Sequence, residues 1–313
     1  MTFLTSWVFW LIFILGLAAI GTIVFMMTVI SRVILNVFLN LPIEADPFRN
    51  EEGILQYSVN IKTRDGISIK GFFIPGKEAQ GRTVVFCHEI GAGAASYQKY
   101  AAYLVEKGFN LFTFDFRGHG LSGNRQGYEP RQWVTSCEMN DLNAVLDYLK
   151  TRRDVDQNRV GLFGISKGAG TALIIAGKKK NIKAVVSDGG FSTRMTLVDY
   201  MRKWTSIYLP VDTLPTSIYW LIEVWSLWVL SRRIKCHFPK LERAIPRLDQ
   251  IPILMIHGKK DNYINPKQAE RIYARVRGPK EIWLVPQARH NESVVVEPVE
   301  YANRVTAFFE KNL

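Results

Sequence analysis

The stretch RVGLFGISKGAG, residues 159–170, contains the pattern G-x-S-x-G centred on Ser166. An apolar run typical of a buried strand leads into the pattern, and a helical pattern follows it. A sharp strand-to-helix turn of this kind strains the backbone of its middle residue and raises the side chain above the carboxyl edge of a sheet. Open α/β sheets bind their ligands at that edge. The pattern alone is common, so its meaning depends on what the rest of the chain places beside the serine.

The rest of the chain alternates apolar runs with helical patterns. Strands are expected at 83–88, 110–116, 159–165, 182–188, 252–258 and 281–286. Helices are expected at 96–108, 137–150, 167–177, 266–277 and 297–311. Two earlier alternating runs, around the turn at Asp65 and Gly66, predict an antiparallel hairpin. The fold class is therefore α/β, with a mostly parallel central sheet and helices on both faces.

One long segment interrupts this alternation. Residues 191–248 separate two expected strands by more than a crossover needs, and they include the aromatic run SIYWLIEVWSLWVL at 217–230. We expect an apolar cap insertion here. Its tryptophans fit either a cap helix packed on the core or a surface that touches lipid.

The N-terminus carries no ionisable side chain before Arg32. As a helix, the apolar stretch from Trp7 to Ile30 would be roughly 36 Å long, enough to cross a hydrocarbon core of about 30 Å. A cleaved signal peptide would have a basic start and a shorter apolar core. We therefore expect a transmembrane anchor at 1–32, a juxtamembrane linker at 33–53 and a main domain at 54–313. The positive charge that follows the span predicts that the main domain lies in the cytoplasm.

Net charge and residue composition restrict the classes of binding partner that we expect. The formal net charge of +12 is compatible with nucleic acid or with anionic lipid. The sequence has no finger-spaced Cys and His and no basic region before a zipper, so we expect no nucleic-acid partner. The charge is then a solvated basic surface or an attraction to anionic lipid. Cys87, Cys137 and Cys236 are odd in number and widely spaced, which predicts no disulfide framework and fits a reducing compartment.

A serine nucleophile needs a general base and a group that orients the base. His290 follows the last expected strand, from where its side chain would reach back to Ser166. Asp261 follows the preceding strand, within HGKKDNYINP, so the chain order is Ser, Asp, His. Asp188, at the end of the strand after the serine helix, is the competing acid. Three other histidines are expected to have structural roles: His88, His119 and His257.

Acyl chemistry also needs an oxyanion hole made of two N–H groups. The residue after the serine, Lys167, would supply one backbone N–H. The loop CHEIGAG, residues 87–93, would supply the other, from Ile90 or as second choice from Glu89. No metal or cofactor is implied.

With these features the chain resembles the α/β-hydrolase superfamily over about residues 54–312. The resemblance rests on HEIG at 88–91, DFRGHGLSG at 115–123, GISKG at 164–168, HGKKD at 257–261 and His290. Within the superfamily, the chain looks most like single-span, membrane-anchored serine hydrolases of the esterase, lipase or thioesterase type. The resemblance implies cleavage of carboxylic esters or thioesters, and the apolar cap and anchor favour lipid-like or acylated substrates.

One departure from the superfamily pattern is Glu89, which replaces a glycine that often precedes the oxyanion residue. Its carboxylate either points outward to a basic partner or points inward, where it would oppose the developing negative charge. Glu89 is the one feature that favours a non-catalytic membrane scaffold with this fold, and the complete Ser, Asp, His set counts against that alternative. An amide or peptide hydrolase is the other alternative.

Overall fold

The computed structural model describes residues 2–39, 57–208 and 215–313. The chain forms two compact units, which are described separately. The helical unit comprises Met1–Pro42 and Leu197–Lys235, and the sheet unit comprises Ile43–Thr196 and Cys236–Leu313. The N-terminal segment and most of the expected cap therefore belong to the same unit.

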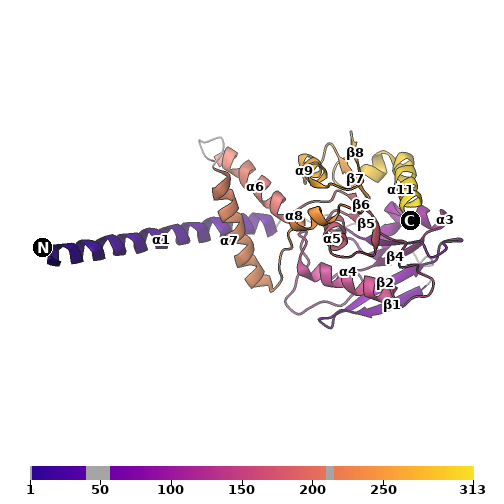
Figure 1. The fold of residues 1–313 in the computed structure, drawn as a ribbon, viewed down its shortest axis with the longest axis horizontal. Coiled ribbons are helices and arrows are strands. Elements are labelled where there is room, and N and C mark those ends of the chain that lie inside the picture. Colours follow the sequence, from indigo (N-terminus) through magenta and orange to yellow (C-terminus); the bar gives the residue numbers. More distant parts are fainter. Residues whose placement is uncertain (1, 40–56, 209–214) are drawn as a thin grey trace. The chain divides into compact units, whose positions relative to one another are not determined.

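The described part of the sheet unit contains an eight-stranded sheet with the order β1-β2-β4-β3-β5-β6-β7-β8 (Figure 1). Its strands are β1 (Tyr57–Lys62), β2 (Ser68–Ile74), β3 (Thr83–Cys87), β4 (Asn110–Phe114), β5 (Val160–Ile165), β6 (Ile182–Asp188), β7 (Ile253–Gly258) and β8 (Lys280–Val285). Strand β2 is antiparallel to both of its neighbours, as the expected hairpin requires, and β3 to β8 are parallel. The central strands β3, β4 and β5 are buried throughout because helices cover both of their faces.

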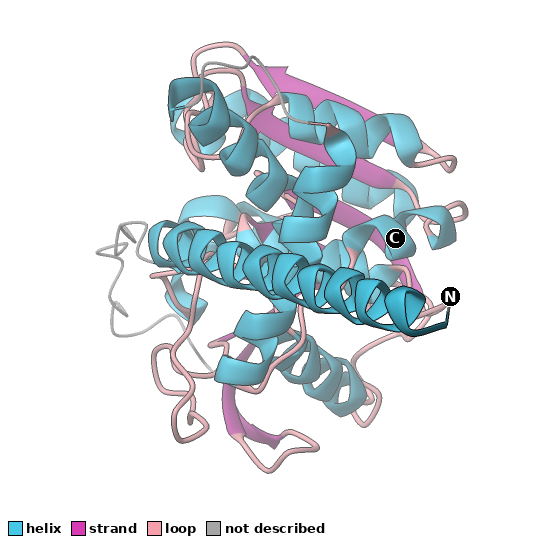
Figure 2. Ribbon diagram, turned by 90° about the vertical axis from the view of Figure 1, so that its left-hand side faces the viewer, coloured by secondary structure: helices cyan, strands magenta, loops and turns pink. Residues whose placement is uncertain are grey.

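Helices of the sheet unit lie on both faces of the sheet (Figure 2). They are α2 (Tyr97–Tyr100), α3 (Tyr103–Glu106), α4 (Ser136–Leu149), α5 (Lys167–Ala176), α8 (Leu241–Ala244), α9 (Lys267–Arg275), α10 (Ser293–Val296) and α11 (Pro298–Asn312), with 3₁₀ turns η1 (Ala94–Ser96) and η2 (Ile245–Arg247). One buried cluster joins α4, α5, α8 and α9 to the sheet, and a second joins α2, α3 and α11 to the opposite face. The expected fold class is confirmed.

The helix expected at 96–108 is divided into η1, α2 and α3. Ala101 leaves the helical conformation, with φ of −139°, between the two short helices. Tyr100 and Leu104, on either side of this break, are both completely buried in the same cluster. Helical periodicity in the sequence therefore marked the buried residues correctly but not the break between them.

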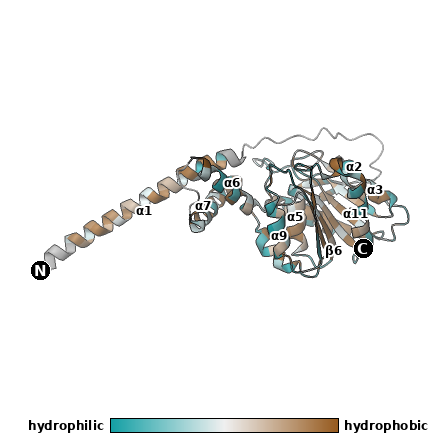
Figure 3. Cartoon of the chain, turned by 90° about the horizontal axis from the view of Figure 1, so that it is seen from above, coloured by the Kyte–Doolittle hydropathy of each residue, from teal (hydrophilic) through white to brown (hydrophobic). Residues whose placement is uncertain are grey.

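The helical unit consists of α1 (Thr2–Leu39), α7 (Thr216–Ile234) and the part of α6 (Thr193–Tyr208) that begins at Leu197. Among the described residues, α1 is the one helix long and apolar enough to cross a membrane, over Trp7–Asn36 (Figure 3). It continues past the anchor boundary expected at residue 32, and residues 40–53 of the expected linker lie outside the described residues.

Two cysteines contradict the sequence prediction. Cys137 and Cys236 form a disulfide, although 99 residues separate them. Backbone and side chain of Ser136 exchange hydrogen bonds with the backbone of His237, at 2.8 and 3.1 Å, and these bonds hold the two segments together. The odd count and wide spacing gave no sign of this contact because it forms only in the tertiary fold. Cys87 is a free, buried residue of β3, as expected for a small core residue.

Candidate active site

Ser166 lies at the junction of β5 and α5, in the conformation expected of a nucleophile turn. Its φ of 51° and ψ of −113° are unusual for a residue with a side chain. A Cβ atom at Gly164 would lie 2.5 Å from the backbone nitrogen of Ala169, and one at Gly168 would overlap the carbonyl oxygen of Cys87. Both flanking positions therefore need glycine because neighbouring backbone passes too close for any side chain.

The structure brings the three predicted triad residues into one chain of hydrogen bonds. Ser166 Oγ lies 2.9 Å from His290 Nε2, and His290 Nδ1 lies 2.6 Å from Asp261 Oδ2. Asp261 follows β7 and His290 follows β8, so loops at the carboxyl ends of three parallel strands contribute one residue each. This arrangement can remove a proton from a serine hydroxyl and hold the resulting imidazolium.

Asp261 is held by its own loop. Its Oδ1 accepts hydrogen bonds from the backbone N–H groups of Tyr263 and Ile264, at 2.8 and 2.7 Å. Its Oδ2 accepts from His290 and lies 3.1 Å from His257 Nε2. Burial alone would raise the pKa of Asp261, but the hydrogen bonds from the two histidines hold that pKa below its usual range. The carboxylate is therefore ionised near neutral pH.

Asp188, the competing acid, has different partners. Its Oδ2 accepts a hydrogen bond from the Tyr301 hydroxyl at 2.8 Å, and Ser293 Oγ lies 3.5 Å from its Oδ1. Burial raises the pKa of Asp188 to about 6. Among the described residues, Asp261 rather than Asp188 is the carboxylate bonded to His290.

Two residues around the triad have contacts that the sequence did not reveal. The ring of Tyr263 lies against His290, with ring centres 5.3 Å apart, and its hydroxyl donates to Gln132 Oε1. His257 has the structural position expected, but it also shares Asp261 Oδ2 with His290. The spacing in HGKKD, which spans the end of β7 and the start of its loop, was the one signal for this second contact.

The two predicted oxyanion donors lie where the loop after β3 meets the first turn of α5. A Cβ atom at Gly168 would overlap the Cys87 carbonyl oxygen and lie 2.6 Å from that of His88, so these two elements can pack this closely only with glycine at this position. Within the described part of the chain, the backbone N–H groups of Ile90 and Lys167 donate no hydrogen bond. Both are therefore available to a ligand, and their assignment to an oxyanion stays a prediction.

Buried polar residues brace this loop. His88 Nε2 accepts from the Phe116 N–H at 3.0 Å, so Nδ1 carries the proton and donates to the Glu89 carbonyl at 2.6 Å. Burial lowers the pKa of His88 well below its usual value, which keeps the ring neutral. The Asp115 carboxylate accepts from the N–H groups of Ala94 and Leu121, at 2.6 and 2.8 Å, and so ties the loop after β3 to the loop after β4.

Glu89 itself is buried rather than exposed to solvent. Its Oε2 lies 3.3 Å from the Ser96 hydroxyl, which donates to it from η1. The loop turns back on itself between these residues, and this proximity was not readable from the spacing of the two in the sequence.

A buried ion pair supports the residue after the nucleophile. Lys167 Nζ lies 2.7 Å from Glu138 Oε1, and both side chains are almost completely buried. The other oxygen of Glu138 accepts from the N–H and the hydroxyl of Thr135, at 2.8 and 2.7 Å, and Tyr128 donates to Oε1. Burial alone would raise the pKa of Glu138, but Lys167 keeps it below its usual range. Sequence reasoning missed this network, although T-x-x-E at 135–138 is a readable capping box.

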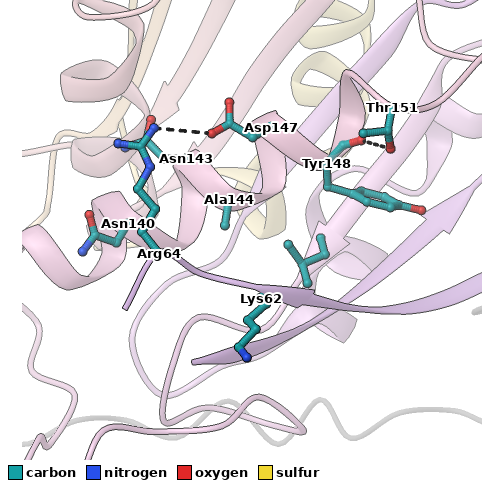
Figure 4. A pocket seen from close by; sticks show the side chains of 9 residues that line it. Lys62, Arg64, Asn140, Asn143, Ala144, Asp147, Tyr148 and Thr151 are labelled. Atoms are coloured by element: carbon teal, nitrogen blue, oxygen red, sulfur yellow. Dashed lines mark hydrogen bonds and ion pairs between the residues drawn. The ribbon is translucent and has the colours of Figure 1, made fainter. Parts of the chain in front are cut away.

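A polar hollow of about 310 Å³ lies elsewhere in the sheet unit, between β1 and α4 (Figure 4). Its lining includes Lys62, Arg64, Asn140 and Tyr148, with Arg64 paired to Asp147 at 3.9 Å. None of its lining residues belongs to the Ser166 site, so the hollow is separate from the predicted chemistry.

Comparisons with known proteins agree with the fold described above. The family described as "Serine aminopeptidase, S33" matches residues 78–213. The solved esterase Pf2001 from Pyrococcus furiosus superposes with a TM-score of 0.64 at 22% identity, covering 88% of this chain and 97% of that one. The esterase EaEST from Exiguobacterium antarcticum superposes with a TM-score of 0.58 at 20% identity, covering 81% and 100%. The chain therefore has the α/β-hydrolase fold.

Relatives of similar length occur in bacteria. The chain is 28% identical to the uncharacterized protein YfhR of Escherichia coli K12 over 239 residues, which is 74% of this chain and 72% of YfhR. It is 27% identical to the uncharacterized protein YqkD of Bacillus subtilis over 271 residues, which is 85% and 83% of the two chains. Both relatives are described as uncharacterized, so these likenesses carry no information about a substrate.

Proposed function

We propose that the chain is a membrane-anchored serine hydrolase that cleaves carboxylic esters or thioesters of lipid-like or acylated substrates. One observation carries the proposal. The chain of hydrogen bonds from Ser166 through His290 to Asp261 starts at a strained strand-to-helix turn. A serine on such a turn, with a histidine base and an ionised acid, is the arrangement that acyl transfer requires.

The proposed mechanism assigns one role to each residue. Ser166 Oγ attacks the carbonyl carbon while His290 Nε2 takes its proton. Asp261 holds the tautomer of His290 that leaves Nε2 free to accept, and it stabilises the imidazolium. The N–H groups of Ile90 and Lys167 stabilise the oxyanion of the tetrahedral intermediate. His290 then protonates the leaving group, and in a second half-reaction it activates the water that releases the acyl group.

The substrate class rests on the apolar parts of the helical unit. The side chains of α1 from Trp7 to Val24 are exposed and apolar, which suits a bilayer and places the enzyme where acylated molecules concentrate. Pf2001 and EaEST are both described as esterases. The family description, a serine aminopeptidase, favours a second candidate, which is an amide or peptide hydrolase using the same three residues.

Two features bear on which side of the membrane the sheet unit lies. Arg32 follows the apolar stretch and favours the cytoplasmic side for the sheet unit, whereas a disulfide such as Cys137–Cys236 is rare there. We propose the cytoplasmic side, which requires these two cysteines to be thiols in the cell. Alkylation of freshly lysed cells followed by mass spectrometry tests this. If neither cysteine is alkylated until the sample is reduced, the two form a disulfide in the cell, and the sheet unit would lie in an oxidising compartment instead.

The substrate experiment compares hydrolysis of short and long acyl esters, an acyl thioester and an amide by the full-length protein in detergent micelles. We expect ester and thioester turnover that increases with acyl length and disappears in the Ser166→Ala variant. Faster turnover of the amide would favour the second candidate. Absence of turnover of every substrate, together with no reaction of Ser166 with a fluorophosphonate, would favour a non-catalytic scaffold.

A further inference from the structure

Helix α7 has two apolar faces, and only one of them is covered within the described chain. The covered face consists of residues that recur at helical spacing and therefore lie on one side of the helix: Tyr219, Ile222, Glu223, Ser226, Leu227 and Leu230. The opposite face presents Trp220, Leu221, Val224 and Trp228, which are 57, 48, 37 and 51% exposed. Each set recurs at helical spacing, so these are two stripes along one helix. A helix that is apolar all round is normally buried or placed in a membrane.

The charges of α7 are restricted to positions that suit a membrane surface. The one acidic residue of α7, Glu223, lies on the covered face. Arg232 and Arg233 in the last turn are exposed, and the Arg232 guanidinium lies 5.5 Å from the ring centre of Trp228. The exposed stripe is therefore uncharged along its length and ends in basic side chains. Aromatic residues beside basic ones are typical of helices that lie in the headgroup region of anionic membranes.

The covered face places α7 against the end of α1 where the apolar stretch stops. Ser226 Oγ and Ser31 Oγ lie 2.9 Å apart in a buried contact between the two helices. In α1, Ser31 and Leu35 are the buried residues, whereas side chains from Trp7 to Phe25 are exposed. The candidate span of 30 residues would be roughly 45 Å long as a helix, longer than a hydrocarbon core of about 30 Å requires. The residues beyond the core, where α7 packs, would then be at the membrane surface.

We propose that α7 is an in-plane membrane contact, with Trp220, Leu221, Val224 and Trp228 inserted at the headgroup boundary and Arg232 and Arg233 paired with anionic lipid. This contact adds a second attachment to α1 and holds the helical unit at the bilayer surface. The inference rests on the proposed anchoring by α1 and is independent of the proposed chemistry at Ser166.

The test uses the full chain reconstituted into phosphatidylcholine vesicles whose acyl chains are brominated near the headgroup, with and without phosphatidylglycerol. Bromine quenches tryptophan on contact. The double variant Trp220→Phe/Trp228→Phe keeps the stripe apolar but removes its fluorophores. Trp283→Phe, on β8 in the sheet unit, is the matched control. We expect the double variant to lose roughly a third or more of the quenched fluorescence and the control to lose none, because Trp7, Trp10, Trp204 and Trp225, which lie in the same helical unit, supply the rest.

The variant Trp7→Phe/Trp10→Phe separates the two attachments. If it reduces quenching while the Trp220/Trp228 variant does not, α1 is inserted but the α7 stripe is covered by protein, from this chain or a second copy, and the inference is wrong. If no variant reduces quenching, the anchoring itself fails and the inference fails with it. For Arg232→Gln/Arg233→Gln, we expect at least a twofold drop in quenching of the stripe in vesicles that contain phosphatidylglycerol and little change in neutral ones. Equal effects in both lipids would contradict the charge pairing.

Discussion

The Asp261→Asn variant tests the proposed hydrogen-bond chain with a change of one atom. In the native site, Oδ1 already accepts the N–H groups of Tyr263 and Ile264. An asparagine would keep its oxygen at that position, because its amide nitrogen cannot accept from two N–H donors. The NH₂ group would then face His290 Nδ1 in place of Oδ2.

The consequence is a change of tautomer in the catalytic histidine. Nδ1 of His290 must accept from the new NH₂ group, so the ring proton moves to Nε2, which faces Ser166. A protonated Nε2 cannot remove the serine proton. An oriented base in the wrong tautomer loses about 10⁴-fold in rate. At about 1.36 kcal/mol for each factor of ten, this is about 5.4 kcal/mol of transition-state stabilisation.

The assay is the rate constant for fluorophosphonate labelling of the full-length protein, which needs no knowledge of the substrate. Asp188→Asn is the control, because Asp188 bonds to Tyr301 and Ser293 rather than to His290. We expect labelling to fall by about 10⁴-fold in Asp261→Asn and by less than about threefold in the control. The reverse order would make Asp188 the acid, and an unchanged rate in both variants would refute the proposed role of a carboxylate.

Three further predictions concern the surroundings of the site. Glu138→Gln should slow fluorophosphonate labelling by about tenfold or more, because loss of the ion pair with Lys167 displaces the Lys167 backbone amide. Asp141→Asn, which breaks the nearby buried ion pair between Asp141 of α4 and Arg117, is the control and should leave the labelling rate within about twofold. Urea denaturation should show Glu138→Gln destabilised by about 3 kcal/mol or more, because it leaves the buried Lys167 charge without its carboxylate, and Asp141→Asn destabilised by less, because Arg117 keeps its ion pair with Asp65. Equal labelling rates in the two variants would refute the positioning role. Because burial raises the pKa of Asp188 from 3.8 to about 6, the folded state binds this proton more tightly than the unfolded state. The unfolding free energy of the wild type relative to Asp188→Asn should thus fall by about 2 kcal/mol as pH rises from about 4 to 6, and a rise over that range would contradict the burial argument. Gly168→Ala should abolish labelling and lower the melting temperature, because its methyl group would overlap the last residue of β3; native-like activity would show that the loop after β3 can shift.

The sheet and the three triad positions could be predicted because their signals are local. Each buried strand is an apolar run, and each site residue follows one of those strands in the sequence. The turn at Ser166 could be predicted from the two flanking glycines, Gly164 and Gly168, where neighbouring backbone leaves no room for a Cβ atom.

The features that escaped prediction depend on distant contacts. The Lys167–Glu138 pair and the Cys137–Cys236 disulfide join positions 29 and 99 residues apart, and no periodic pattern reports such pairings. The burial of Glu89 depends on how one loop folds back towards η1. The aromatic run at 217–230 was readable as apolar, but only the packing of α7 on α1 separates its covered face from its exposed one.

The central claim is that Ser166 is a nucleophile activated by His290. Mass spectrometric mapping of the full-length protein after fluorophosphonate treatment tests it most directly. We expect one covalent adduct, on the peptide containing Ser166, which is absent from Ser166→Ala and reduced to background in His290→Ala. An adduct on another residue, or labelling that persists without Ser166, would contradict it.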